Sequence, residues 1–240
     1  MTRRILALSI LSLGSLSLPA QAVELDAIGS LGQNDFRLLS EDLGAALSYK
    51  PLTPAEPLGL IGFDLGIEVS ATKLENPEIF DIAATGAAPG TLYLPKLHAH
   101  MGLPFGFDIG ASYAAVPDSN IKAWGAELRY AILKGGTAAP ALAVRASYSA
   151  LDGADELKLT TTGLDVSISK GFAMFTPYAG IGKVWVTSTP DPSTGLAEED
   201  FDLNKVFVGV NMNLVVLNIA IEGDKTGDAT SYGIKFGWRF

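Results

Sequence analysis

The sequence YGIKFGWRF, residues 232–240, ends the chain and alternates between large apolar side chains and small or charged ones. Its large apolar residues are Tyr232, Ile234, Phe236, Trp238 and Phe240. Glycines, a lysine and an arginine separate them. Because a period of two is typical of a β-strand with one apolar and one polar face, we expect the chain to end in such a strand.

The terminal strand also has a counterpart among known proteins. A strand that ends in Phe240, with Trp238 two residues before it, resembles the closing strand of bacterial outer-membrane β-barrels. By pattern, the rest of the chain is similar to the small, uncharacterised barrels of Gram-negative bacteria. The resemblance implies a transmembrane barrel in the cell outer membrane. It also implies that the five apolar residues of 232–240 are the signal that the barrel-assembly machinery recognises.

The N-terminus has the features of an export signal. Arg3 and Arg4 precede an apolar stretch over residues 5–18, and the small residues of Ala20-Gln21-Ala22 follow. We therefore expect residues 1–22 to be a signal peptide that is cleaved after Ala22. The alternative is a membrane anchor, but the apolar stretch is short for a bilayer span of about 20 residues.

Composition excludes several classes of function. The net charge of −9 would become −11 on loss of Arg3 and Arg4, which argues against a nucleic-acid partner because phosphate binding needs basic clusters. The chain has no cysteine, which excludes disulfides and thiolate metal sites. Mean hydropathy is positive at +0.28, yet no segment after the signal has 18 consecutive apolar residues. A hydrophobic chain without a helical membrane span is typical of a barrel whose strands alternate between apolar and polar residues.

Alternating segments recur along the chain and predict about ten strands. They lie near 58–72, 91–103, 107–116, 121–132, 141–151, 157–170, 175–187, 202–214, 216–224 and 229–240. In the strand 175–187 the apolar alternation changes parity around Gly182-Lys183, which indicates a β-bulge.

The connections decide between a barrel and a soluble β-sandwich, which would show the same alternation. Long acidic segments, such as 73–90 and 188–201, alternate with short turns, such as 104–106 and 170–174. Long outer loops and tight periplasmic turns are typical of outer-membrane barrels. We therefore expect an all-β fold, a transmembrane antiparallel up-and-down β-barrel, over residues 58–240.

Residues 23–57 precede the barrel and form an ambiguous segment. Asn34 could cap a helix over 34–47 whose apolar positions share one face, but residues 43–49 also alternate as a strand would. If the segment is a helix, the number of strands stays even at ten. If it is a strand, it is the eleventh, and a twelfth is needed elsewhere in the chain. The helix would either plug the barrel or rest at its periplasmic rim. A segment that obstructs the lumen is similar to the arrangement in the fatty-acid transporter group.

Charged side chains fall on the polar face of the predicted strands and would line the lumen. These residues are Asp64, Glu68, Lys96, His98, His100, Asp108, Glu127, Arg129, Arg145, Asp165, Lys205, Glu222, Lys235 and Arg239. Buried charges need partners, so we expect ion pairs that brace the wall. The alternative, which is compatible with bracing, is a polar pore whose charges select solutes.

The two histidines are the remaining candidates for chemistry. His98 and His100 would share the lumen face, but a zinc site needs a third and a fourth ligand, and we expect no metal and no cofactor. Omptin-type proteases are similar in strand number but need a histidine at the outer mouth. Here both histidines lie within a strand, so we do not expect an enzyme.

Two functions remain after these exclusions. The first is a passive narrow pore or uptake channel for small or apolar solutes, or a structural barrel. The second is a surface adhesion protein that acts through its acidic loops. In either case the expected partners are outer-membrane lipid, lipopolysaccharide and the assembly machinery.

Overall fold

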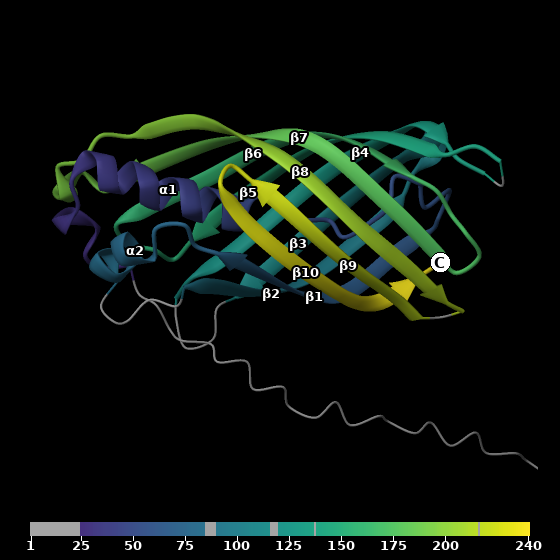
Figure 1. The fold of residues 1–240 in the computed structure, drawn as a ribbon, viewed down its shortest axis with the longest axis horizontal. Coiled ribbons are helices and arrows are strands. Elements are labelled where there is room, and N and C mark those ends of the chain that lie inside the picture. The colour runs from purple at the N-terminus through teal and green to yellow at the C-terminus, as the bar shows by residue number, and fades with distance from the viewer. Residues whose placement is uncertain (1–24, 85–89, 116–119, 137, 216) are drawn as a thin grey trace, which may run out of the picture.

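The computed structural model describes residues 25–84, 90–115, 120–136, 138–215 and 217–240, and they form a closed antiparallel barrel of ten strands (Figure 1). The predicted up-and-down barrel is thereby confirmed. The strands are β1 (Phe63–Lys73), β2 (Thr91–Gly102), β3 (Phe107–Ala115), β4 (Lys122–Lys134), β5 (Ala141–Asp152), β6 (Leu157–Ser169), β7 (Phe175–Pro190), β8 (Glu199–Leu214), β9 (Leu217–Thr226) and β10 (Ala229–Arg239).

The barrel closes where the first strand meets the last. β1 pairs with β10 from Asp64 opposite Arg239 to Lys73 opposite Thr230. Phe63 and Phe240 exchange backbone hydrogen bonds of 3.0 and 2.9 Å beyond the end of this ladder. Closure pairs the backbone of both strands, so neither is left as an exposed edge that could recruit another chain.

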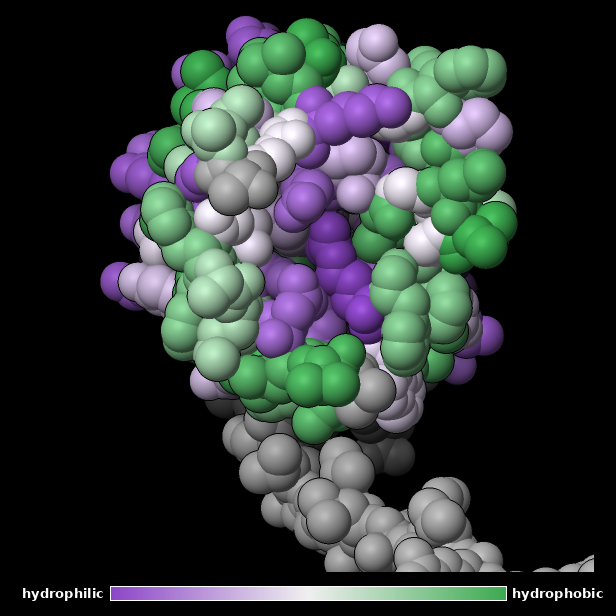
Figure 2. All heavy atoms as spheres, turned by 90° about the vertical axis from the view of Figure 1, so that its right-hand side faces the viewer, coloured by the Kyte–Doolittle hydropathy of each residue, from purple (hydrophilic) through white to green (hydrophobic). Residues whose placement is uncertain are grey.

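The barrel has its apolar side chains outside and its charges inside. Large apolar residues such as Ile67, Leu97 and Phe236 point outward and are 48–60% exposed, whereas Arg129 and Lys235 are buried. Figure 2 shows the same division at one end, with hydrophilic residues in a hollowed centre and hydrophobic residues around them. An apolar exterior of this extent suits lipid rather than water. Among the described residues, the helices are too short or too polar to cross a membrane.

The two ends of the barrel differ. The connections after β1, β3, β5, β7 and β9 lie at one end, here called the loop end, and the other connections lie at the turn end, near the C-terminus (Figure 1). The connection after β1 contains the helix α2 (Pro77–Ala83), and the one after β7 contains the 3-10 helix η3 (Pro192–Thr194). A further short helix, η2 (Pro104–Gly106), lies at the turn end.

The β-bulge predicted at Gly182-Lys183 is wrong. β7 pairs in continuous register with β6 and β8, and a register shift occurs instead between Ala131 and Leu133 of β4. The parity of the apolar residues changes because Val184 and Val186 point inward and pack against a helix in the barrel mouth. An inward apolar patch therefore imitates a bulge in the sequence pattern.

Two helices precede the barrel. They are the 3-10 helix η1 (Ile28–Ser30) and α1 (Gln33–Leu47), which confirms the predicted N-terminal helix. Residues 48–62 connect α1 to β1 without forming a strand.

Candidate functional site

The helix α1 lies within the loop end of the barrel and is surrounded by wall strands (Figure 1). It contacts β1, β5, β6, β7, β8 and β10. Phe36 and Leu39 are buried in an apolar core shared with Val186. Gly44 faces the same valine so closely that a Cβ there would lie 2.8 Å from a Val186 methyl group. The apolar face of α1 therefore rests on the inward apolar patch of β7.

Polar contacts attach the same helix to the wall and to a loop. The Ser40 and Ser188 hydroxyl oxygens are 2.7 Å apart in a buried hydrogen bond. The Asp42 carboxylate accepts bonds of 3.1 and 2.9 Å from the backbone amides of Glu75 and Asn76, just before α2. Burial raises the pKa of Asp42 above its usual value. α1 is therefore attached both to the barrel and to the connection between β1 and β2.

Beyond α1 the chain runs down the lumen, where its backbone and side chains meet the wall. The Lys205 ammonium donates a 2.6 Å hydrogen bond to the Tyr49 carbonyl oxygen, and the Tyr49 hydroxyl lies 3.2 Å from His100 Nε2. Lys50 Nζ donates to the Ala45 carbonyl oxygen at 2.8 Å and pairs with Asp224 at 3.7 Å.

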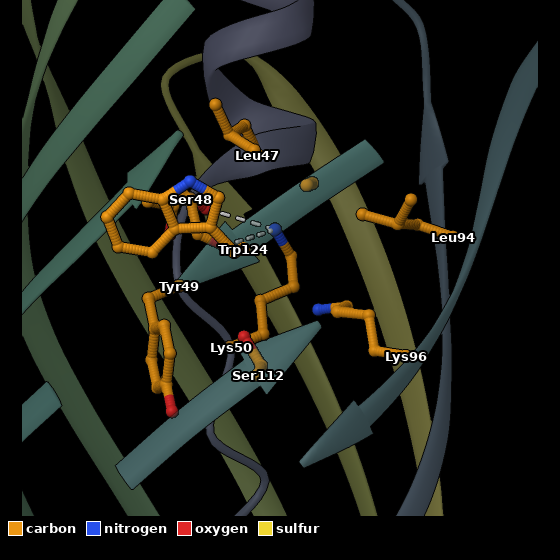
Figure 3. Close-up of a pocket in the computed structure, with 10 residues that line it drawn as sticks. Leu47, Ser48, Tyr49, Lys50, Leu94, Lys96, Ser112 and Trp124 are labelled. Atoms are coloured by element: carbon orange, nitrogen blue, oxygen red, sulfur yellow. Dashed lines mark hydrogen bonds between the residues drawn. The ribbon is translucent and has the colours of Figure 1, made fainter. Parts of the chain in front are cut away.

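A small cavity lies beside this part of the chain. Figure 3 shows Lys50 with its ammonium turned toward Ser48, near Lys96, while Tyr49 points away from them. The cavity that these residues line has a volume of about 10 Å³. That is about the space one water molecule needs.

Nearer the turn end, a buried ion pair binds the lumen chain. The Arg129 guanidinium donates to the Pro54 carbonyl oxygen at 2.6 Å and to the Thr53 hydroxyl at 3.0 Å. It also donates to Asp108 at 2.9 and 3.1 Å, and Asp108 accepts a 3.0 Å bond from the Leu58 backbone amide. We refer to residues 25–57 as the plug: η1 packs against α2 and η3 at the loop end, and α1 and the residues after it run inside the barrel toward the turn end.

The lumen residues predicted from the sequence all point inward, and Lys96 and Arg239 keep only slight exposure. Several of them form ion pairs between strands, all between neighbouring strands except the last, which joins β8 to β6 past β7. These pairs are Lys235–Asp64 at 2.7 Å, Lys96–Glu68 at 2.7 Å, Arg145–Glu127 at 2.9 Å, Arg145–Asp165 at 3.4 Å and Lys205–Asp165 at 3.7 Å. Glu222 is buried beside this group. Such pairs offset the desolvation that each charge suffers inside the barrel.

One cluster has the residue types of a metal site. Ligand atoms of Asp64, His98 and His100 lie within 4.8 Å of one another. However, Asp64 already accepts a 2.7 Å bond from Lys235 and lies 3.6 Å from Arg239. Two cations beside the carboxylate would repel a metal ion, so the arrangement fits an ion-pair cluster better than a metal centre.

Plug residues that contact the wall were not among the predicted site residues. Asp42, Tyr49, Lys50 and Thr53 each bond or pair with the barrel or its loops. The only signal in the sequence was the spacing of the prolines in 51–57, which predicts an extended segment but gives no information about its location.

Comparison with known proteins finds only distant likenesses. No protein-family model and no curated protein matches the chain. Among solved structures, the KdgM porin is 10% identical with a TM-score of 0.38, over 74% of this chain and 99% of that one. The Ail attachment protein of Yersinia pestis is 12% identical with a TM-score of 0.30, over 75% and 97%. A de novo designed transmembrane β-barrel is 9% identical with a TM-score of 0.32, over 77% and 99%.

Proposed function

We propose that the protein is an integral outer-membrane barrel whose polar lumen is a narrow path for small polar solutes, and that the plug holds this path closed. The outward apolar side chains support the membrane location. In this arrangement the turn end faces the periplasm and the loop end faces outside. The charged lumen disfavours apolar solutes, which would have to pass buried ion pairs.

One observation carries the gating proposal. The lumen holds a segment that bonds to the wall, notably through Lys205 and Arg129, and that is not a strand of the barrel. Since the ten strands pair with one another in a closed ring, the plug can leave without breaking any strand pairing. A path closed by a separable segment can open, whereas a lumen filled by its own wall cannot.

The test is single-channel conductance in planar bilayers of residues 23–240 and of the same chain lacking residues 25–57. We expect the full chain to be closed for most of the time and the shortened chain to give steady current steps. Heat-modifiable migration on a gel shows that both are folded. A folded but silent shortened chain would mean that the wall alone blocks the lumen, and the channel proposal would fail.

A second candidate function is surface interaction through the loop end. The apolar core there joins Ile28 of η1, Phe36 of α1 and Phe80 of α2, so the connections rest on a packed base. Exposed acidic residues lie above it, among them Glu78, Asp155 and Glu198. The variant E78Q/D155N/E198Q separates the two functions. Loss of adhesion to host cells or surfaces with unchanged conductance would favour interaction, and unchanged adhesion would remove this candidate.

A further inference from the structure

A shallow groove runs over the outward face of β6, β7, β8 and β9, away from the lumen and the plug. Its volume is about 570 Å³. Its floor consists of Leu164, Val166, Ile181 and Val206, whose side chains are 44–67% exposed. Strand register makes this floor continuous, because Ile181 lies opposite Val166 on one side and Val206 on the other. The groove is therefore an apolar channel on the surface that we expect lipid to cover.

Two lysines border the groove toward the loop end. Lys183 of β7 lies opposite Asn204 of β8, and Lys225 of β9 lies opposite Val206. They therefore flank β8 from its two sides, and both line the groove. Trp185 lines it as well, two residues beyond Lys183 toward the loop end. Indole rings favour the boundary between hydrocarbon and headgroups, and a lysine close to that boundary can extend its side chain so that the ammonium reaches the headgroups.

The polarity of this surface changes along the strands. Toward the turn end, the outward residues next to the groove are apolar, as at Ile168, Val208 and Ile221. A ligand that fits must therefore be apolar along most of its length and anionic at the end near the lysines. An acyl chain with a phosphorylated headgroup has that distribution.

The acidic neighbours of the lysines leave them able to bind an anion. Lys183 Nζ is 2.8 Å from an Asp202 carboxylate oxygen, in a pair whose side chains are 44% and 47% exposed. Lys225 Nζ is 3.9 Å from Asp228, in a pair that is more exposed still. Exposed ion pairs are weak, and each ammonium has three protons to donate. Both lysines can thus contact a phosphate.

We propose that this groove is a binding site for lipid A of the outer leaflet, with one acyl chain along the floor and a phosphate between Lys183 and Lys225. The proposal rests on the membrane location and orientation given above but not on gating. Lysine near an anionic lipid surface contributes roughly a five-fold gain in affinity, so the two together contribute about 25-fold.

The test is lipid retention by the full chain in detergent, measured by native mass spectrometry with added lipid A. The variant K183Q/K225Q removes the two charges, and V206W fills the groove without a change of charge. The matched control is K122Q/K158Q, which removes two exposed lysines at the loop ends of β4 and β6, outside the groove.

We expect about 25-fold weaker lipid A binding for K183Q/K225Q, a comparable loss for V206W, and less than a two-fold change for the control. Dephosphorylated lipid A should bind about as weakly to the wild-type chain as lipid A binds to K183Q/K225Q. Heat-modifiable migration and insertion into vesicles should be unchanged in every variant, so a failure here is separable from a failure of the barrel proposal. Unchanged binding by K183Q/K225Q, an equal loss in the control, or equal binding of dephosphorylated lipid would each overturn the site.

Discussion

The substitution Arg129→Met should destabilise the barrel through the charge that it leaves behind. Arg129 is 1% exposed, and its partner Asp108 is fully buried. The guanidinium makes two bonds to Asp108 and one each to Thr53 and Pro54. Methionine fills much of the same volume but donates no hydrogen bond. Asp108 would then keep the Leu58 amide as a donor but would lose its counter-charge.

The magnitude follows from the burial of the pair. Removing one partner of a buried ion pair costs about 3–5 kcal/mol, whereas replacing both by uncharged groups is often nearly neutral. The double variant D108N/R129M keeps an acceptor for the Leu58 amide and removes both charges. We therefore expect the double variant to recover at least half of the unfolding free energy that R129M loses. This corresponds to a coupling energy of about 2 kcal/mol or more between the two positions.

Urea-induced unfolding from lipid vesicles, followed by heat-modifiable migration, measures the free energies of the wild-type chain, both single variants and the double variant. Additive single and double effects would refute the reasoning, since they would mean that Asp108 and Arg129 do not act as a pair. A loss below about 1 kcal/mol for R129M would refute it as well, because it would show that water reaches the site.

Three further outcomes follow from the contacts of the plug and of the closing strands. Gly44→Ala places a methyl group against Val186, so it should destabilise the packed position of the plug by about 1–3 kcal/mol and increase the time for which the channel is open. Val186→Ala in the same chain should restore closure. An unchanged open time in the single variant would contradict the packing. A peptide tag inserted before Leu25 should react with antibody on intact cells, because Leu25 packs into the apolar core at the loop end. A tag that antibody reaches only after the cells are permeabilised would contradict the orientation. Deletion of Phe240 removes its ring contact with Phe63 and the two backbone hydrogen bonds between them. The fraction of protein assembled in the outer membrane, measured by heat-modifiable migration on a gel, should fall several-fold. Unchanged assembly would argue against the terminal strand as the assembly signal.

The strands could be predicted because lipid and lumen act on alternate residues. Every strand has one face toward each environment, and the terminal strand from Tyr232 to Phe240 shows the pattern most clearly. The same alternation predicted that the charged residues point into the lumen. Exceptions include Val184 and Val186, which point inward into the apolar core shared with α1, together with Leu157 and Leu159 of β6.

The course of the plug could not be predicted for a physical reason. Residues 48–57 bond to the wall in part through backbone carbonyl oxygens, as at Tyr49 and Pro54, and such contacts do not depend on the residue type. The helix α2 was also missed, because its seven residues are too few to show a helical period. Its apolar residues Ile79 and Phe80 are buried against partners far away in the sequence.

The measurement that tests the plug most directly is single-channel current through S40C/S188C before and after reduction. The two serine hydroxyls already meet at 2.7 Å, and the chain has no other cysteine to compete for the bond. With the disulfide formed, α1 is held to β7, and we expect a silent channel. Reduction should release α1 and restore the openings of the full chain, with current steps of the size that the chain lacking residues 25–57 shows. Equal current in the oxidised and reduced states would contradict the claim that movement of the plug opens the lumen.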